Sequence, residues 1–166
     1  ESELDFVKET IKENLNLNKT IEVIKFIPLF STSREGDSAS QFHSKCNGKS
    51  NSLVLVKTKA GKRFGGFTSL HWSYASNNYA NDSNSFLFSL DNRECYKYNS
   101  GYGIYCYSSY GPTFGGGFDL YLTNNCLSNN DSSTSQSSFN YNGKDYALNG
   151  SSNFTVEVYE VYQVNV

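Results

Sequence analysis

The chain has 166 residues, a length that suits one domain with a core of its own. Aromatic residues make up 16% of it, charged residues only 18%, and methionine is absent, a composition that favours a β-rich domain over a helical bundle. The net charge of −2 comes from 14 basic and 16 acidic residues mixed along the chain. This balance excludes the basic footprint of a nucleic-acid binder, and no apolar run is long enough to insert into a membrane.

The cysteines are widely and irregularly spaced, without the Cys-x-x-Cys pairs typical of zinc sites and redox couples. They are Cys46, Cys95, Cys106 and Cys126. Four free thiols indicate a reducing compartment, and the acidic N-terminus does not resemble a secretory signal. We therefore expect a cytoplasmic domain that holds no metal ion or cofactor.

An amphipathic helix is predicted from residue 2 to about 17. Ser2 can cap it, and apolar residues recur at spacings of three and four at Leu4, Val7, Ile11 and Leu15. The helix either packs on the domain or forms the end of a coiled coil, and we favour packing. The expected organisation is an N-terminal helix and linker over residues 1–20, followed by one domain over residues 21–166.

The next two elements are a strand and a short helix. Ile21–Phe30 is mostly apolar, and Pro28 restricts it to an edge or a strand end. Ser38 and Gln41 have the spacing of a capping box, and Asn47 with Gly48 is a stop signal, so a helix is predicted from about 39 to 46.

The remainder of the chain predicts strands joined by polar turns. We expect a hairpin of 53–56 with 63–68, a strand at 86–90, a pair formed by 94–98 and 104–108, a strand at 118–122, an Asn-Gly hairpin within 139–148, and a last strand from 153 to the end. Residues 124–138, with ten Ser or Asn in fifteen, should form a mobile surface loop. The fold class is mainly β (α+β), an antiparallel two-sheet β-sandwich with short flanking helices.

The last strand raises a question at Glu160. Strict alternation places Phe154, Val156, Val158, Glu160, Tyr162 and Val164 on one face. Either the strand bulges, or a carboxylate points inward and needs a partner such as Arg34 or Arg63. A buried ion pair is favoured over a catalytic acid with a raised pKa.

Gly115, Gly116 and Gly117 form a triplet beside an aromatic run. They do not match a phosphate-binding loop, because Lys and Ser/Thr are missing and a strand, not a helix, follows. We predict a structural bend in which at least one of the three has a positive φ. Asp119 is then expected to accept hydrogen bonds from amides of its own turn. Phe64-Gly-Gly and Phe114-Gly-Gly, 50 residues apart, are interpreted as two glycine bends of one sandwich, not as propeller repeats.

His43 and Cys46 lie three residues apart on the predicted short helix, within reach of each other. Such a pair can form a reactive thiolate. An ordinary helix with Phe42 and Cys46 facing the core is much commoner.

Five motifs in order together resemble the TLDc family. They are Ser33-Arg-Glu-Gly-Asp-Ser38 with Phe42-His-x-x-Cys46, then Lys62-Arg-Phe-Gly-Gly-Phe-Thr68 with Trp72, then Phe86-Leu-Phe-Ser-Leu90, then Gly111-Pro-x-Phe-Gly-Gly-Gly117-x-Asp119-Leu120, and Val158-Tyr-Glu160-Val-Tyr162. The resemblance runs from about residue 25 to 164 and leaves out the first helix and residues 124–138. It implies a β-sandwich in proteins linked to oxidative-stress resistance and to binding and regulating the V-type proton ATPase.

The resemblance implies a non-enzymatic interaction module whose partner is the peripheral sector of that ATPase, with no small-molecule substrate. The family has no established catalytic residues, so Gly115, Gly116, Gly117, Asp119 and Glu160 are expected to be partner-binding or structural positions. Two alternatives stay open: a structural adaptor in a larger assembly that docks through residues 1–17, and a thiol-dependent antioxidant enzyme that uses Cys46 or Cys106.

Overall fold

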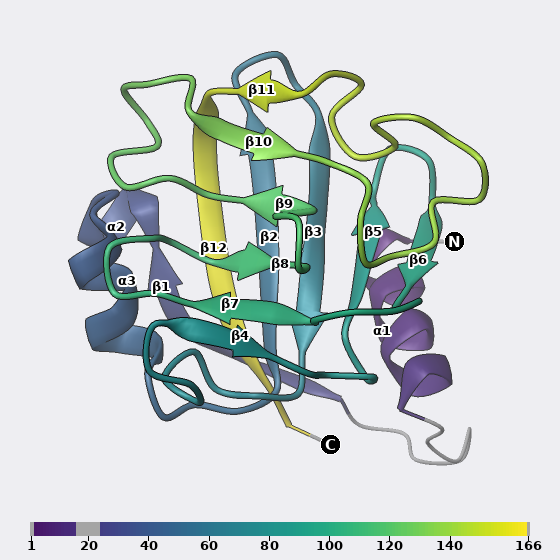
Figure 1. Ribbon diagram of the computed structural model, residues 1–166, viewed down its shortest axis with the longest axis horizontal. Helices are drawn as coiled ribbons and strands as arrows, with labels where there is room; N and C mark the ends of the chain where they lie inside the picture. Colours follow the sequence, from purple (N-terminus) through teal and green to yellow (C-terminus); the bar gives the residue numbers. More distant parts are fainter. Residues whose placement is uncertain (1, 16–23, 166) are drawn as a thin grey trace.

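The computed structural model describes residues 2–15 and 24–165, and its strands form two antiparallel sheets of six. In order, sheet A contains β1 (Lys25–Ser31), β12 (Val156–Asn165), β2 (Ser52–Thr58), β3 (Arg63–Thr68), β5 (Phe86–Ser89) and β6 (Glu94–Lys97). Sheet B contains β11 (Asn153–Phe154), β10 (Ser132–Thr134), β9 (Leu120–Tyr121), β8 (Thr113–Phe114), β7 (Ile104–Cys106) and β4 (Asn78–Ala80). Figure 1 shows sheet B in front of sheet A, with its strands running across those of sheet A. The predicted antiparallel sandwich is confirmed.

The helices lie where their capping residues predict. Helix α1 (Glu3–Asn14) begins at Ser2, whose hydroxyl accepts a bond from the Asp5 amide, and α3 (Ala39–Cys46) begins at Ser38, which accepts one from Gln41. A short α2 (Thr32–Glu35) directly follows β1. As its proline requires, β1 is an edge strand. The predicted helix end at 16–17, the linker to residue 20 and the strand start at 21–23 lie outside the described residues.

Aromatic side chains from both sheets and α3 fill the space between the sheets. The Trp72 ring packs edge-on against Phe42 of α3 and Phe114 of β8, and its indole N–H donates to Ser52 at 2.9 Å. A side chain on Gly66 would collide with the ring of Phe114. Glycine is therefore needed here so that β8 can approach β3 closely. Gly65 and Gly66 lie in an unbroken strand register, so the prediction of a bend at this motif is wrong.

A second core lies on the other side of sheet A, under α1. Val7 and Ile11 of the helix face Phe67 and Phe88 of the sheet, and all four side chains are buried. The interpretation of α1 as a helix packed on the domain agrees with this arrangement (Figure 1).

Two strand pairings differ from the predictions. Residues 94–98 and 104–108 do not pair with each other, because β6 pairs with β5 in sheet A whereas β7 pairs with β4 and β8 in sheet B. The segment between them crosses from one sheet to the other. Asn142 and Gly143 have the positive φ of the predicted turn, but strands do not flank it, and only Phe139 forms a bridge, with Tyr98.

The segment 124–138 is not the structureless surface loop that its composition predicts. Its residues 132–134 form β10, which pairs with β9 and β11. Ser132 and Ser138 are buried and accept hydrogen bonds from the amides of Thr123 and Gly116. These hydroxyl groups accept hydrogen bonds from buried backbone amides. A segment rich in serine can therefore be buried in this fold.

A bulge between Val156 and Val158 shifts the register of β12. Tyr159 and Val161, together with Val156, belong to the core between the sheets. Glu160 lies on the opposite side of the strand, so the predicted common face is wrong and the bulge explains why.

An aromatic face on sheet B as the candidate functional site

Seven aromatic rings form one connected surface on sheet B, which we call the aromatic face. Its residues are Tyr79, Tyr102, Tyr105, Tyr107, Tyr110, Phe118 and Tyr121, all of them partly or well exposed. Ring centroids lie 4.8 Å apart between Tyr79 and Tyr102, and 4.7 Å apart between Tyr110 and Tyr121. This is a high concentration of rings that are at least partly exposed, and exposed apolar patches mark interaction sites.

Side chains alternate between the two faces of each short strand, and this alternation points the rings outward. In β7, Ile104 and Cys106 are buried while Tyr105 between them is partly exposed. In β9, Leu120 is buried and Tyr121 is partly exposed. Tyr79 of β4 stands directly opposite Tyr105 in the ladder, with centroids 4.5 Å apart. The pleat thus gives sheet B an apolar inner side and an aromatic outer side.

Phe118 reaches the centre of the face from a turn and not from a strand. Its centroid lies 5.3 Å from that of Tyr105 and 5.5 Å from that of Tyr121. Its φ is +58°, a left-handed conformation that is an outlier for a bulky residue and costs roughly 1 kcal/mol or more. The predicted strand over 118–122 therefore begins only at Leu120.

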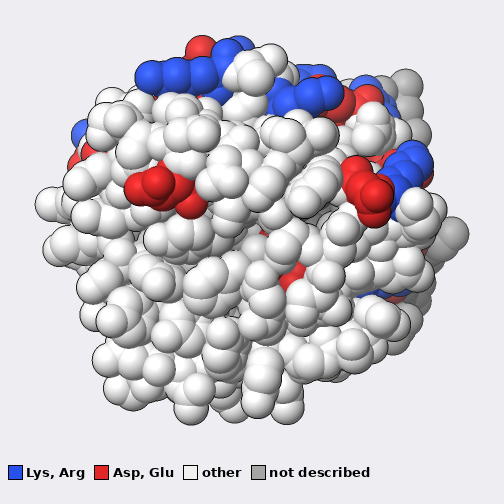
Figure 2. Space-filling view, turned by 45° about the horizontal axis from the view of Figure 1, so that its top comes forward, with Lys and Arg blue, Asp and Glu red and all other residues white. Residues whose placement is uncertain are grey.

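The aromatic face contains no basic residue. Lys and Arg are absent from residues 64–92 and 98–143, which hold five of the six strands of sheet B. In Figure 2 the front of the molecule is mostly white, and the blue atoms gather along its upper rim. Burial raises the pKa of Tyr105, and its neighbours Tyr110, Tyr79 and Tyr107 add to this effect. The Tyr105 hydroxyl therefore stays neutral at physiological pH.

Behind the face, the Asp119 carboxylate organises the backbone. It is fully buried and accepts hydrogen bonds from the amides of Ser137, Ser138 and Phe139 at 3.0–3.3 Å. The Tyr141 hydroxyl donates to it at 2.6 Å. These donors follow β10, so the prediction that Asp119 binds amides of its own turn is wrong.

The three glycines fit around this carboxylate. Gly115 has a φ of +89°, which confirms the prediction of a positive φ, and a side chain there would overlap the Asp119 carboxylate. The Gly116 amide donates to Ser138 at 2.8 Å, and the Gly117 carbonyl accepts from Ser135 at 2.6 Å. The structure thus brings Asp119 and the triplet together in one turn that carries Phe118 to the face.

Asp82 is a second buried carboxylate near sheet B that the sequence did not reveal. It accepts bonds from the hydroxyls of Thr68 and Ser69 at 2.6 and 2.7 Å, and from the amides of Ser69 and Asn84. These hydroxyl and amide donors are neutral, as are those of Asp119.

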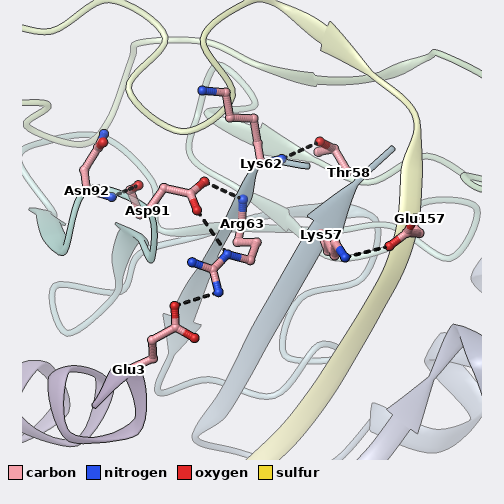
Figure 3. Close-up of polar contacts among 9 residues, drawn as sticks. Glu3, Lys57, Thr58, Lys62, Arg63, Asp91, Asn92 and Glu157 are labelled. Atoms are coloured by element: carbon pink, nitrogen blue, oxygen red, sulfur yellow. Dashed lines mark hydrogen bonds and ion pairs between the residues drawn. The ribbon is translucent and has the colours of Figure 1, made fainter. Parts of the chain in front are cut away.

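Glu160 lies in sheet A, away from the triplet. Its carboxylate accepts a hydrogen bond from Tyr162 at 3.1 Å. Arg34 pairs with Glu35 instead, and Arg63 pairs with Glu3 at 2.6 Å and with Asp91 at 3.0 Å (Figure 3). The favoured buried ion pair with either arginine is therefore wrong.

The geometry does not create a reactive thiol. Burial raises the pKa of Cys46 to about 12 and that of Cys126 to about 12, and it raises the pKa of Cys95 to about 11. Cys106 is buried and its pKa is raised as well. The His43 ring contacts Asn47 and the carbonyls of Tyr107 and Tyr110.

The described residues 2–15 and 24–165 contain no group of three or more His, Cys, Asp or Glu side chains placed to hold a metal ion. None of their helices is long and apolar enough to cross a membrane.

A family model, the TLDc domain, matches residues 6–165. The chain belongs to the TLDc family. The match includes most of α1 and the whole of 124–138, both of which the motif resemblance left out. A comparison with curated proteins gave no match.

Sequence reasoning missed the aromatic face of this TLDc domain. Two signals were present: the density of tyrosines between Tyr98 and Tyr110, and the absence of Lys and Arg from residues 98–143. The face was not predictable from either signal alone, because three separate segments contribute its rings.

Proposed function

We propose that this TLDc domain is a non-catalytic, cytoplasmic interaction module that binds a protein partner through the aromatic face of sheet B. The observation that carries the proposal is the face itself: seven contiguous rings, of which Tyr102 is exposed and the other six are partly exposed, without a basic residue among them. Interface centres are enriched in aromatic residues and depleted in charged ones. Large exposed aromatic patches are rare on proteins that have no binding partner.

The partner we propose is the peripheral sector of the V-type proton ATPase, and the wider role is resistance to oxidative stress. The family resemblance supports both. The raised pKa values of the thiols favour a binding role over a thiol-dependent enzyme, because the thiolate is the reactive species. The docking-helix alternative is disfavoured because Val7 and Ile11 of α1 are already buried against sheet A.

A binding measurement with the purified peripheral sector tests this function. The immobilised domain should capture the sector, and exchange of Tyr105 and Tyr110 for leucine should weaken capture about tenfold or more, since aromatic anchors dominate interface energies. Glu157→Gln, at an exposed ion pair of sheet A, is the matched control and should bind normally. Failure of the unaltered domain to bind would refute the choice of partner. Equal binding by the leucine variant would refute the choice of surface.

A further inference from the structure

The electrostatics of sheet B indicate what kind of side chain its aromatic face accepts. Three carboxylates, those of Asp82, Asp119 and Asp131, lie in segments that form or adjoin the sheet, and these segments contain no Lys or Arg. The hydrogen bonds to Asp82 and Asp119 come from neutral hydroxyl and amide donors. Because these segments supply no cation of their own, the outer side of the sheet carries an excess of negative charge, although Lys59 of the β2–β3 turn reaches the Leu127 carbonyl in the loop before Asp131.

Asp131 brings a solvent-accessible carboxylate to the edge of the aromatic face. It is exposed and precedes β10, the strand beside β9. Burial raises the pKa of Tyr121, and the nearby Tyr110 and Asp131 act in the same direction. A cation bound over Tyr121 would therefore have an acidic group within reach.

The rings add a second attraction for cations. The faces of aromatic rings carry partial negative charge, and a cation over a Tyr ring gains about 0.5–2 kcal/mol, depending on how far it is desolvated. Tyr102 is 43% exposed at one end of the face. Tyr110 and Tyr121, with centroids 4.7 Å apart, lie at the other end.

We infer that the aromatic face binds a segment of its protein partner that carries arginine side chains, with guanidinium groups stacked on the tyrosine rings. Arginine fits better than lysine because its planar group stacks on rings, is weakly hydrated, and donates several hydrogen bonds at once. The tyrosine hydroxyls and Asp131 supply the acceptors. The inference rests on the proposed function, because it names the chemistry of the partner at the same face.

The test uses the 166-residue chain and two short peptides. One peptide alternates glycine with arginine, and the other alternates glycine with citrulline. Citrulline has nearly the shape of arginine but no charge. Titrations followed by the tyrosine ring signals in NMR spectra should show shifts of Tyr105, Tyr110 and Tyr121 with the arginine peptide. The citrulline peptide should bind about tenfold more weakly or worse, a difference of about 1.4 kcal/mol. Equal affinities would overturn the inference.

Two double variants separate ring stacking from simple apolar contact. Tyr105→Phe with Tyr110→Phe keeps the ring faces but removes two hydroxyl acceptors, so it should weaken binding of the arginine peptide only slightly, whereas leucine at both positions should abolish it. Tyr74→Leu changes a tyrosine that is 58% exposed and outside the face, and should have no effect. Retained binding by the leucine variant would contradict the inference. If that variant unfolds, the comparison of peptides on the unaltered domain still decides.

The outcome is distinguishable from a failure of the proposed function. If the domain captures the ATPase sector but does not discriminate the two peptides, the inference falls and the function stands. If it discriminates the peptides but does not capture the sector, the arginine chemistry stands and the partner is a different protein.

Discussion

Asp119 joins the glycine turn to the segment that follows β10. Its carboxylate accepts hydrogen bonds from three backbone amides, among them those of Ser137 and Ser138, and from one hydroxyl. Burial, with the nearby Asp119, raises the pKa of Tyr141, which remains a donor. The residue that the motif singles out thus holds the turn that places Phe118.

Asp119→Ala should lower the free energy of unfolding by about 3 kcal/mol or more, because it leaves several buried donors unpaired. Chemical denaturation followed by tyrosine and tryptophan fluorescence measures the loss. Asp145→Asn, at an exposed carboxylate that accepts a hydrogen bond from Gln136, should change the free energy of unfolding by less than about 0.5 kcal/mol. A loss of that small size for Asp119→Ala would contradict the assigned role.

Alanine variants of Gly115 and Gly48 can distinguish the cost of backbone strain at a positive φ from the cost of steric overlap. Both have positive φ, +89° and +78°, but a side chain at Gly115 overlaps Asp119 whereas nothing lies within 4 Å of one at Gly48. Gly48→Ala should cost about 1 kcal/mol for the backbone alone, and Gly115→Ala should cost at least about 2 kcal/mol more. Thermal unfolding of the two variants measures the difference, and equal losses would mean that the turn relaxes around the added methyl group.

The buried thiols make stability depend on alkaline pH. The pKa of Cys126 is raised from 9.0 to about 12 by burial, and Asp37 acts in the same direction. The thiol ionises more readily in the unfolded chain, so its contribution is fully present below pH 9 and is lost as the pH rises toward 12. Denaturation across this window should show a fall in the free energy of unfolding that is shallower in Cys126→Ala. Parallel curves would show that the thiol ionises equally in both states.

At the scale of elements, α1 depends on packing more than on charge. Ile11 is fully buried against sheet A, whereas the Glu3 and Arg63 side chains of the ion pair in Figure 3 are 41% and 38% exposed. We therefore expect the apolar side of α1, more than its ion pair, to hold the helix on sheet A.

Ile11→Ala should cost about 3 kcal/mol because it leaves a cavity under the helix. Glu3→Gln should cost less than about 1 kcal/mol, since exposed ion pairs contribute little. Hydrogen exchange of the α1 amides, together with global denaturation, measures both effects. A larger loss from Glu3→Gln than from Ile11→Ala would mean that the ion pair holds the helix.

Element prediction succeeded where local chemistry decides the structure. The caps at Ser2 and Ser38 and the restriction of Pro28 to an edge strand are local features, and the structure confirms them. It failed where distant partners decide. The amide donors for Asp119 lie 18 to 20 residues away, and β10 is a strand because β9 and β11 pair with it.

On the scale of the whole molecule, the two sheets differ in what they present to solvent. Sheet A is covered by α1 and carries ion pairs such as that of Lys57 with Glu157. The segments 64–92 and 98–143, which supply most of sheet B, lack Lys and Arg, and the sheet carries seven connected rings on its outer side. This division matches the proposal that the aromatic side of the molecule is the binding surface.

The affinity of the domain for the ATPase peripheral sector, compared between the unaltered chain and the Tyr105→Leu, Tyr110→Leu variant, tests this account most directly. If the aromatic face makes the contact, as we propose, the dissociation constant should rise about tenfold or more while the unfolding temperature changes little. Glu157→Gln should leave the constant unchanged. An unchanged constant for the leucine variant, with the sector still bound, would show that another surface makes the contact.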